Sequence, residues 1–142
     1  MSAVSYLLDT VVLSELRKSK PAPAVLRWVR AQQPQQLFIS VVSVGEIERG
    51  IEKARKSEPA ESVFASELGQ WLETLLAVYG EHILPVSTPI ARRWGSLSAK
   101  LGNDGADILI AATALTHGLT VATRNVKHFS PTGASVLNPF ER

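Results

Sequence analysis

The sequence predicts an α/β fold, in which a parallel sheet carries helices on both faces. Short apolar runs of strand length alternate with longer segments of helical spacing, and no hairpin turn joins neighbouring runs. The chain has 142 residues, of which 45% are apolar and 20% charged, a composition typical of one soluble domain with one core. Because parallel strands need helical crossovers, the alternation indicates four or five strands in a single domain over residues 1–142.

The first half of the chain is expected to hold two strands and four helical segments. Pro23 suits the first turn of the second helix, and Pro59 allows a break before the fourth. Either Ser40 or Ser43 can cap the third helix, and Ser43 has capping-box spacing to Glu46. In order, the expected elements are a strand at 4–8, a short helix at 11–17, a helix from 23 to about 32, a strand at 37–39, a helix reaching about 56 and a long helix at 60–79.

The second half repeats the same alternation. Pro85 places the first of its strands at a sheet edge or a strand end. Ser87 or Thr88 can cap the helix that follows, with Pro89 in its first turn, and Gly118 suits the end of the last helix. The expected elements are a strand at 83–86, a helix reaching 101, a loop at 102–105, a helix at 107–117, a strand at 119–123 and a fifth strand at 136–137.

Charge and cysteine content narrow the class of protein. The net charge is +2 and the isoelectric point is about 9.2, a balance that permits a nucleic-acid partner without requiring one. The chain has no cysteine, which excludes disulfides and thiolate metal sites and suits a reducing cytoplasm. No apolar window approaches the roughly 18 residues of a membrane span. We therefore expect a cytoplasmic protein with no membrane segment.

Polar side chains from distant segments are expected to meet at one edge of the sheet. Asp9 directly follows the first strand, Glu46 lies early in the helix after the second, and Asp107 begins the helix before the fourth. Thr123 and Asn125 follow the fourth strand. The carboxyl ends of parallel strands share one edge, where open α/β sheets place their ligand sites. These five residues are therefore the candidate site.

Clustered carboxylates point to a divalent cation. Carboxylates packed together repel and take up protons unless a cation neutralises them, and Mg²⁺ or Mn²⁺ prefers such oxygen ligands. Such an ion activates water for phosphodiester hydrolysis. Local alternatives stay open: Asp9 as a helix cap, Glu46 as the capping-box partner of Ser43, Asp107 as a first-turn acid and Asn125 as a turn residue. Their coincidence on one predicted edge favours the metal site.

Four motifs together resemble the PIN-domain ribonucleases, above all the VapC toxins of VapBC toxin–antitoxin pairs and their FitB-like members. The motifs are Leu7-Leu8-Asp9-Thr10, Ser43-Val44-Gly45-Glu46-Ile47, the helix from Asp107 to Ala114, and the segment from Thr123 to Phe129. The resemblance runs from about residue 4 to residue 139. It implies a three-layer α/β/α sandwich and a metal-dependent endoribonuclease that cleaves a structured RNA such as tRNA or rRNA.

The resemblance also implies a role for each site residue. Asp9 and Asp107 match the metal-binding acids of the family, and Glu46 matches a third acid that often acts through water. Asn125 falls where many PIN domains carry a fourth acid, and Thr123 matches a small hydroxyl residue that lines the site. The implied partners are a VapB-like antitoxin, which blocks the site and alone contacts operator DNA, and a second copy of the toxin in a homodimer.

One departure from the family pattern keeps a second hypothesis open. The family usually has Asn two residues after the first Asp, and Val11 stands there in this chain. That change is compatible with a catalytically weak or inactive PIN-like binding module that acts only through an antitoxin or DNA-binding partner. A phospho-acceptor domain of receiver type also has an acidic pocket, but no Lys follows the fourth or fifth strand in the required place.

Overall fold

The computed structural model describes residues 4–57, 59 and 63–141, and its centre is a parallel sheet. Within these residues the sheet has five strands in the order β3-β2-β1-β4-β5, and every neighbouring pair is parallel. The expected α/β class is confirmed, and so is the fifth strand. The strands are β1 (Tyr6–Leu8), β2 (Leu37–Ser40), β3 (Ile83–Leu84), β4 (Thr120–Ala122) and β5 (Val136–Leu137).

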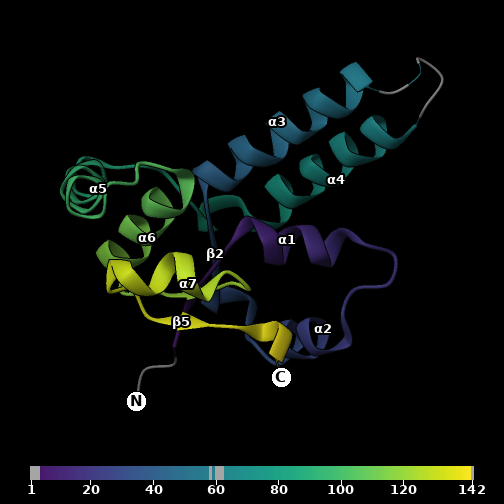
Figure 1. The fold of residues 1–142 in the computed structure, drawn as a ribbon. Helices are drawn as coiled ribbons and strands as arrows, with labels where there is room; N and C mark the ends of the chain where they lie inside the picture. Colours follow the sequence, from purple (N-terminus) through teal and green to yellow (C-terminus); the bar gives the residue numbers. More distant parts are fainter. Residues whose placement is uncertain (1–3, 58, 60–62, 142) are drawn as a thin grey trace.

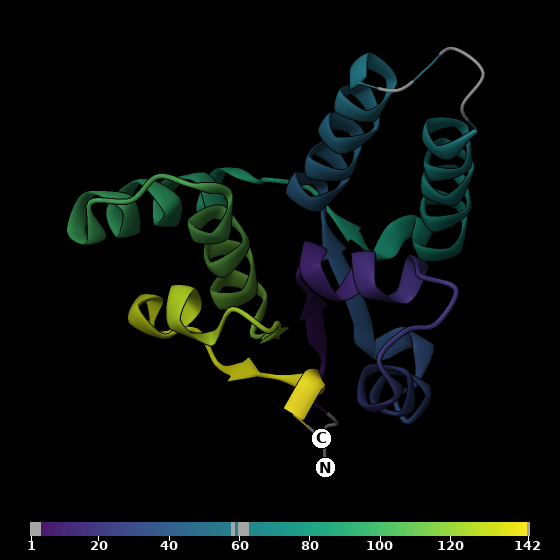
Figure 2. The same ribbon diagram turned by 45° about the vertical axis from the view of Figure 1, so that its right-hand side comes forward.

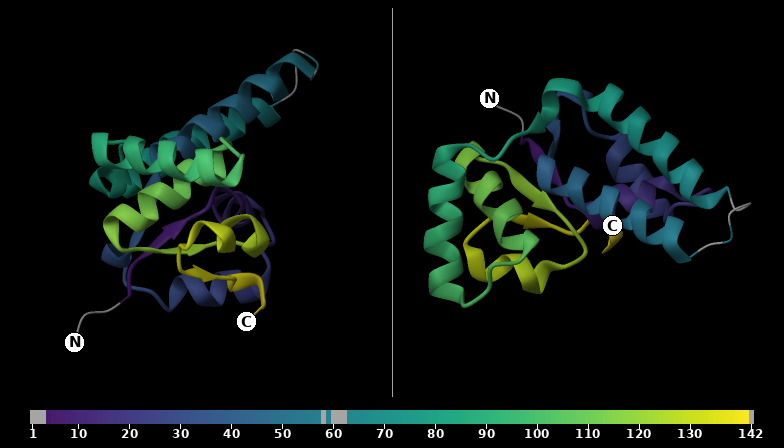
Figure 3. Two further views of the ribbon diagram at one scale, coloured as in Figure 1. Left: turned by 60° about the vertical axis from the view of Figure 1, so that its left-hand side comes forward. Right: turned by 90° about the horizontal axis from the view of Figure 1, so that it is seen from above.

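Helices cover both faces of this sheet. Seen from above, α1–α4 lie on one side and α5–α7 on the other (Figure 3). The helices α3 and α4 run side by side and project beyond the sheet as a hairpin (Figures 1 and 2). Their bounds are α1 (Thr10–Arg17), α2 (Pro23–Arg30), α3 (Val41–Ser57), α4 (Phe64–Tyr79), α5 (Thr88–Leu101), α6 (Ala106–His117) and α7 (Val126–Phe129). Short 3₁₀ turns are η1 (Pro34–Gln36), η2 (Gly80–His82), η3 (Ser130–Thr132) and η4 (Pro139–Glu141).

Successive residues of β1 show why the sheet is buried on both sides. Leu8 packs into a core cluster with residues of α1–α4, such as Val12 and Ile47. Leu7 packs into a second cluster with residues of α6 and α7, such as Ile110 and Phe129. Side chains alternate between the faces of a strand, so a central strand with helices on both sides reads as a continuous apolar run.

The strand order places a crevice beside β1. The chain moves outward from β1 to β2 and β3, then crosses back to lay β4 and β5 on the other side of β1. Such a reversal of strand order is where open α/β sheets bind their ligands, at the carboxyl ends. Asp9 and Thr123 are the residues that follow β1 and β4, and the Asp9 N–H still donates to Ala122 O at 3.0 Å. These two residues are therefore held at the crevice by the sheet itself.

Most predicted helix ends are confirmed, but the capping box is wrong. Ser87 caps α5, and Gly118 ends α6 with a φ of +66°, a left-handed conformation that favours glycine. The predicted box between Ser43 and Glu46 does not form, because α3 begins earlier, at Val41. There the Ser40 Oγ accepts the N–H of residue 42 at 3.0 Å, so Ser43 and Glu46 lie inside the helix and their side chains are free for other partners.

The remaining differences concern element ends. The first strand begins at residue 6 rather than 4, the third spans only residues 83–84, and the fourth only 120–122. The third strand lies at the edge of the sheet, as Pro85 predicted. The helix expected from residue 60 begins at Phe64, and residues 60–62 lie outside the described residues. In the described part of the chain, no helix has the length and apolar character needed to cross a membrane.

Candidate active site

Asp9 is a buried carboxylate with two hydrogen-bond donors. The residue is 6% exposed. Its Oδ1 accepts from the Thr10 N–H at 2.8 Å, and its Oδ2 accepts from Thr123 Oγ1 at 2.8 Å. Asp9 is thus the N-cap of α1 as well as a site residue, so the two readings of the sequence are compatible. Each carboxylate oxygen retains a further lone pair for another ligand.

The charge on Asp9 is unfavourable in this setting. Burial raises the pKa of Asp9 above its usual value, and the nearby carboxylates of Glu46 and Asp107 raise it further. The hydrogen bonds from Thr123 and Thr10 oppose that rise, because they stabilise the ionised form. A cation beside Asp9 would offset both the cost of burying its negative charge and the repulsion from the neighbouring carboxylates.

Thr123 stands directly behind Asp9 at the end of β4. Its side chain is fully buried. Besides donating to Asp9, its Oγ1 accepts from the Asn125 N–H at 2.9 Å. Asn125 is exposed and precedes α7, to which its side chain contributes no cap. Thr123 therefore links the buried acid to the turn that carries Asn125.

Glu46 is held by a hydroxyl group that the sequence reasoning did not single out. Thr10 Oγ1 lies 2.6 Å from Glu46 Oε1 and 2.8 Å from Ser43 Oγ. Thr10 is the first residue of α1, whereas Ser43 and Glu46 lie one turn apart on α3. The local sequence offers no signal for this contact, because Thr10 is 33 residues from Ser43 and 36 from Glu46.

Asp107 lies in the first turn of α6, where the partial positive charge of the helix end favours an acid. Its Oδ1 accepts from the following N–H at 3.1 Å, and its Oδ2 lies 3.7 Å from His128 Nδ1. A Cβ at Gly105, two residues earlier, would lie 3.0 Å from Asp107 Oδ1 and 3.2 Å from Asn103 Oδ1, so a larger residue there would displace these side chains. His128 has no metal-ligand spacing to another histidine in the sequence, and only the fold brings it here.

One pocket collects these groups. It has a volume of about 400 Å³ and contains three carboxylates, from Asp9, Glu46 and Asp107, together with Asn125. Thr123 does not line it and acts from behind Asp9. Val11 lines it where the family pattern leads one to expect an amide. The other lining residues are Thr10, Asn103, Ala106, Ile110, His128 and Phe129.

The donor set fits a hydrated cation better than a closed protein cage. Across residues 4–57, 59 and 63–141, no three Asp, Glu, His or Cys side chains are grouped closely enough to hold a metal ion by themselves. Mg²⁺ is usually held by one or two carboxylates and keeps several of its waters. Asp9 and Asp107 match that pattern, because their charges interact and both line the same pocket.

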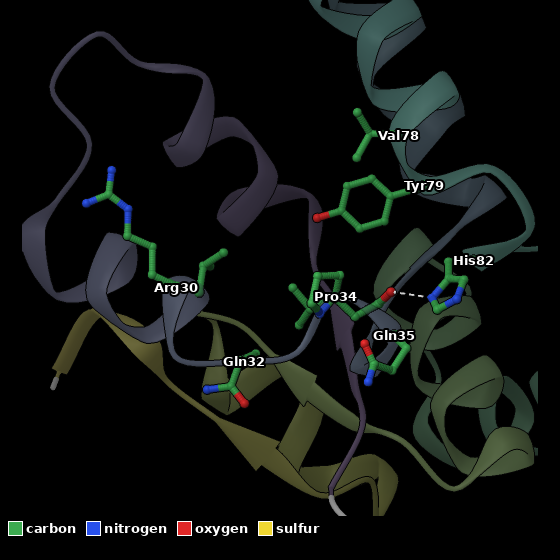
Figure 4. Close-up of a pocket in the computed structure, with 9 residues that line it drawn as sticks. Arg30, Gln32, Pro34, Gln35, Val78, Tyr79 and His82 are labelled. Carbon is green, nitrogen blue, oxygen red and sulfur yellow. Dashed lines mark hydrogen bonds between the residues drawn. The ribbon is translucent and has the colours of Figure 1, made fainter.

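A larger pocket lies at the opposite edge of the sheet. It has a volume of about 630 Å³ and adjoins η1 and η2, which precede β2 and β3 (Figure 4). His82 forms part of its wall, with Nδ1 at 2.9 Å from Leu37 O and its ring stacked on Phe38 at 4.3 Å between centroids. Its other lining residues include Val29, Arg30, Gln32 and Tyr79. No acidic residue lines it, so it lacks the carboxylates that the predicted chemistry requires.

Comparison with known proteins agrees with this geometry. The sequence model of the PIN-domain family matches residues 6–132 of this chain. The VapC ribonuclease Y4jK of Sinorhizobium fredii is 36% identical over 140 residues, which cover 95% of this chain and 97% of the relative. The toxin FitB of Neisseria gonorrhoeae is 30% identical over 139 residues, which cover 94% of this chain and 97% of the relative. The crystal structure of FitAcB from Neisseria gonorrhoeae superimposes with a TM-score of 0.81 at 30% identity, over 96% of this chain and 99% of the other.

The parallel sheet, the acidic crevice at its carboxyl edge and the match over residues 6–132 define a class: the chain belongs to the PIN-domain family. Within that family it is a VapC ribonuclease toxin of a type II toxin–antitoxin system, as its 36% identity to a VapC ribonuclease over 95% of this chain shows. The resemblance read from the four sequence motifs is thereby confirmed, including its FitB-like character.

Proposed function

We propose that this toxin hydrolyses RNA phosphodiester bonds with Mg²⁺ or Mn²⁺ held by Asp9 and Asp107. The observation that carries this proposal is the meeting of three carboxylates, from segments far apart in the sequence, in one open pocket. When bound, the ion would neutralise these charges and lower the pKa of a coordinated water, which makes that water a nucleophile at neutral pH. The substrate is a structured RNA such as tRNA or rRNA.

The residues of the chain then have distinct tasks. Thr123 and the Thr10 N–H keep Asp9 oriented toward the pocket and favour its ionised form. Glu46 offers Oε2, which has no hydrogen bond within the described residues, to orient the attacking water and accept its proton. Asn125 contributes an amide to the pocket mouth, where it can donate to a phosphate oxygen.

Cleavage of tRNA and rRNA with Mg²⁺ or Mn²⁺ tests the proposal. Asp9→Asn and Asp107→Asn should each lower the cleavage rate by on the order of 100-fold, equivalent to about 2.7 kcal/mol of transition-state stabilisation. Asp104→Asn is the matched control, because it removes an exposed carboxylate from the neighbouring loop that does not line the pocket. Full activity in both pocket variants would refute the assignment.

The second function is a binding module without catalysis, and Val11 is the observation that favours it. An apolar side chain in the pocket wall removes a polar contact that would otherwise orient Asp9 or a water. Calorimetric titration with Mn²⁺ separates the two functions. Mn²⁺ binding together with RNA cleavage supports the nuclease, whereas the absence of both, and of growth arrest on expression, supports the binding module.

The proposed partners follow from membership of a type II toxin family. The toxin would act in the cytoplasm as a homodimer and be blocked by a VapB-like antitoxin, which would contact operator DNA on behalf of the complex. If the gene immediately upstream encodes a small antitoxin-like protein, its co-expression should relieve growth arrest and yield a stable complex. Operator binding should require that protein, so DNA binding by the toxin alone would contradict this part of the proposal.

A further inference from the structure

Thr10 contacts both acids on either side of the crevice. Its backbone N–H donates to Asp9 Oδ1 at 2.8 Å, and its hydroxyl lies 2.6 Å from Glu46 Oε1. The same hydroxyl lies 2.8 Å from the Oγ of Ser43, whose side chain is fully buried. A single residue at the start of α1 thus connects the acid of β1 with the acid of α3.

The direction of these hydrogen bonds can be assigned by counting protons. A hydroxyl carries one proton, and an ionised carboxylate only accepts. No buried side-chain nitrogen or oxygen in the described residues lacks a partner, and the contact to Thr10 is the one hydrogen bond found there for Ser43. Both contacts are satisfied when Ser43 donates to Thr10 and Thr10 donates to Glu46. Because Ser43 donates to the Thr10 hydroxyl, the single hydroxyl proton of Thr10 is available to donate to the Glu46 carboxylate.

We infer that Thr10 is a positioning residue, which with Ser43 behind it holds Glu46 by Oε1 and leaves Oε2 for the water of the metal site. The inference rests on the proposed nuclease function. The Thr10 hydroxyl would then orient an acid in a pocket where Val11 supplies no polar group. A hydrogen bond from a hydroxyl to a charged acceptor is short and strong, which agrees with the 2.6 Å contact.

The test measures Mn²⁺ affinity by calorimetry without RNA and, separately, RNA cleavage. Replacing a residue that hydrogen-bonds to a group of a metal site typically lowers metal affinity or activity ten- to a hundredfold. We expect a loss on that order for Thr10→Val. Thr10→Ser keeps the hydroxyl and should restore most of both properties. Ser43→Ala is the matched control, because it removes the hydroxyl that contacts Thr10 but leaves the hydrogen bond between Thr10 and Glu46. The loss of Mn²⁺ affinity and of cleavage should therefore be clearly smaller than in Thr10→Val.

Two double variants distinguish positioning from a general effect on folding. Thr10→Val leaves the buried Ser43 hydroxyl without a partner, so Thr10→Val with Ser43→Ala removes both groups and should show the same loss as Thr10→Val. Glu46→Ala removes the group through which Thr10 acts, so adding Thr10→Val to it should lower Mn²⁺ affinity no further.

Several results would overturn the inference. These are wild-type affinity and activity in Thr10→Val, recovery on adding Ser43→Ala, a Ser43→Ala loss as large as that of Thr10→Val, or an additive loss in the Glu46→Ala background. A wild-type protein that neither binds Mn²⁺ nor cleaves RNA would refute the proposed function and this inference together. A wild-type protein that does both, beside an unaffected Thr10→Val, would refute this inference alone.

Discussion

Replacing Thr123 by valine removes one buried hydrogen bond to a charged group with almost no change in shape. Thr123 is fully buried, and its Oγ1 donates to Asp9 Oδ2 at 2.8 Å. Hydrogen bonds to charged groups contribute about 1.5–3 kcal/mol. At neutral pH and without metal, we therefore expect Thr123→Val to lower the free energy of unfolding by about that amount. The Asn125 N–H, which also loses its acceptor, belongs to an exposed residue and can bond to water.

The pH dependence of this loss has a definite sign. Burial, the main cause, raises the pKa of Asp9 in the folded protein above 3.8, so the free energy of unfolding falls as pH rises from 3.8 through the folded pKa. The bond from Thr123 opposes that rise, so Thr123→Val raises the pKa of Asp9 further and extends the fall to higher pH. Near pH 3.8 the bond is largely to a neutral acid and contributes only about 0.5–1.5 kcal/mol. The difference between the two proteins must therefore grow with pH.

Urea denaturation between pH 4 and pH 8 in the presence of a chelator measures this difference. Thr123→Ser keeps the hydroxyl and should recover most of the loss at pH 8. RNA cleavage with saturating Mn²⁺ gives a second readout, because the acid limb of its pH profile should move to higher pH in Thr123→Val. A loss of stability that is constant across this pH range would show that the Thr123 hydroxyl does not act on the charge of Asp9.

Three further substitutions test two residues of the acidic pocket and one acid at the end of α1. Without metal, Asp9→Asn should raise the thermal midpoint, because it removes a buried charge repelled by its neighbours, and it should abolish stabilisation by Mg²⁺; a lower midpoint would contradict this. Val11→Asn should increase Mn²⁺ affinity by on the order of tenfold in calorimetry, and unchanged affinity would show that the amide is dispensable. Hydrogen bonds from Lys18 and the Ala22 N–H lower the pKa of Glu15, so its stabilisation is full above pH 4.5 and is lost as pH falls through the folded pKa. Glu15→Gln should therefore destabilise the protein at pH 7, and urea denaturation should show this loss shrinking as pH falls below 4.5.

Topology made the acidic site predictable. Once alternation of strands and helices indicates a parallel sheet, every strand must end at the same edge, so acids that follow different strands have to approach one another. Asp9, Glu46, Asp107 and Asn125 were singled out on that basis, and all four line the pocket. The metal-binding roles of the acids stay predictions until the variants above are measured.

The groups that sequence reasoning missed are those that act across the fold. His128 has no informative spacing, yet its Nδ1 lies 3.7 Å from Asp107 Oδ2 because α6 and α7 pack together. Asn103 lines the pocket from the loop at 102–105, within which its Oδ1 accepts the Gly105 N–H at 2.9 Å. That local bond is typical of a turn and predicts the loop, but not its place in the pocket. The approach of His128 to Asp107 leaves no periodic or motif-like trace in the sequence.

The order of strands and helices along the chain, the shared edge and the acids on it are all predictable from the sequence, because they follow from periodicity, chain direction and the avoidance of buried charge within strands. The partner of each polar side chain depends on the three-dimensional packing. Ser43 and Glu46 have the spacing of a capping box, yet Ser40 begins the helix earlier and Thr10 binds both side chains instead. Local spacing lists the hydrogen bonds that a hydroxyl or carboxylate can make, whereas packing against distant segments determines which bond it makes.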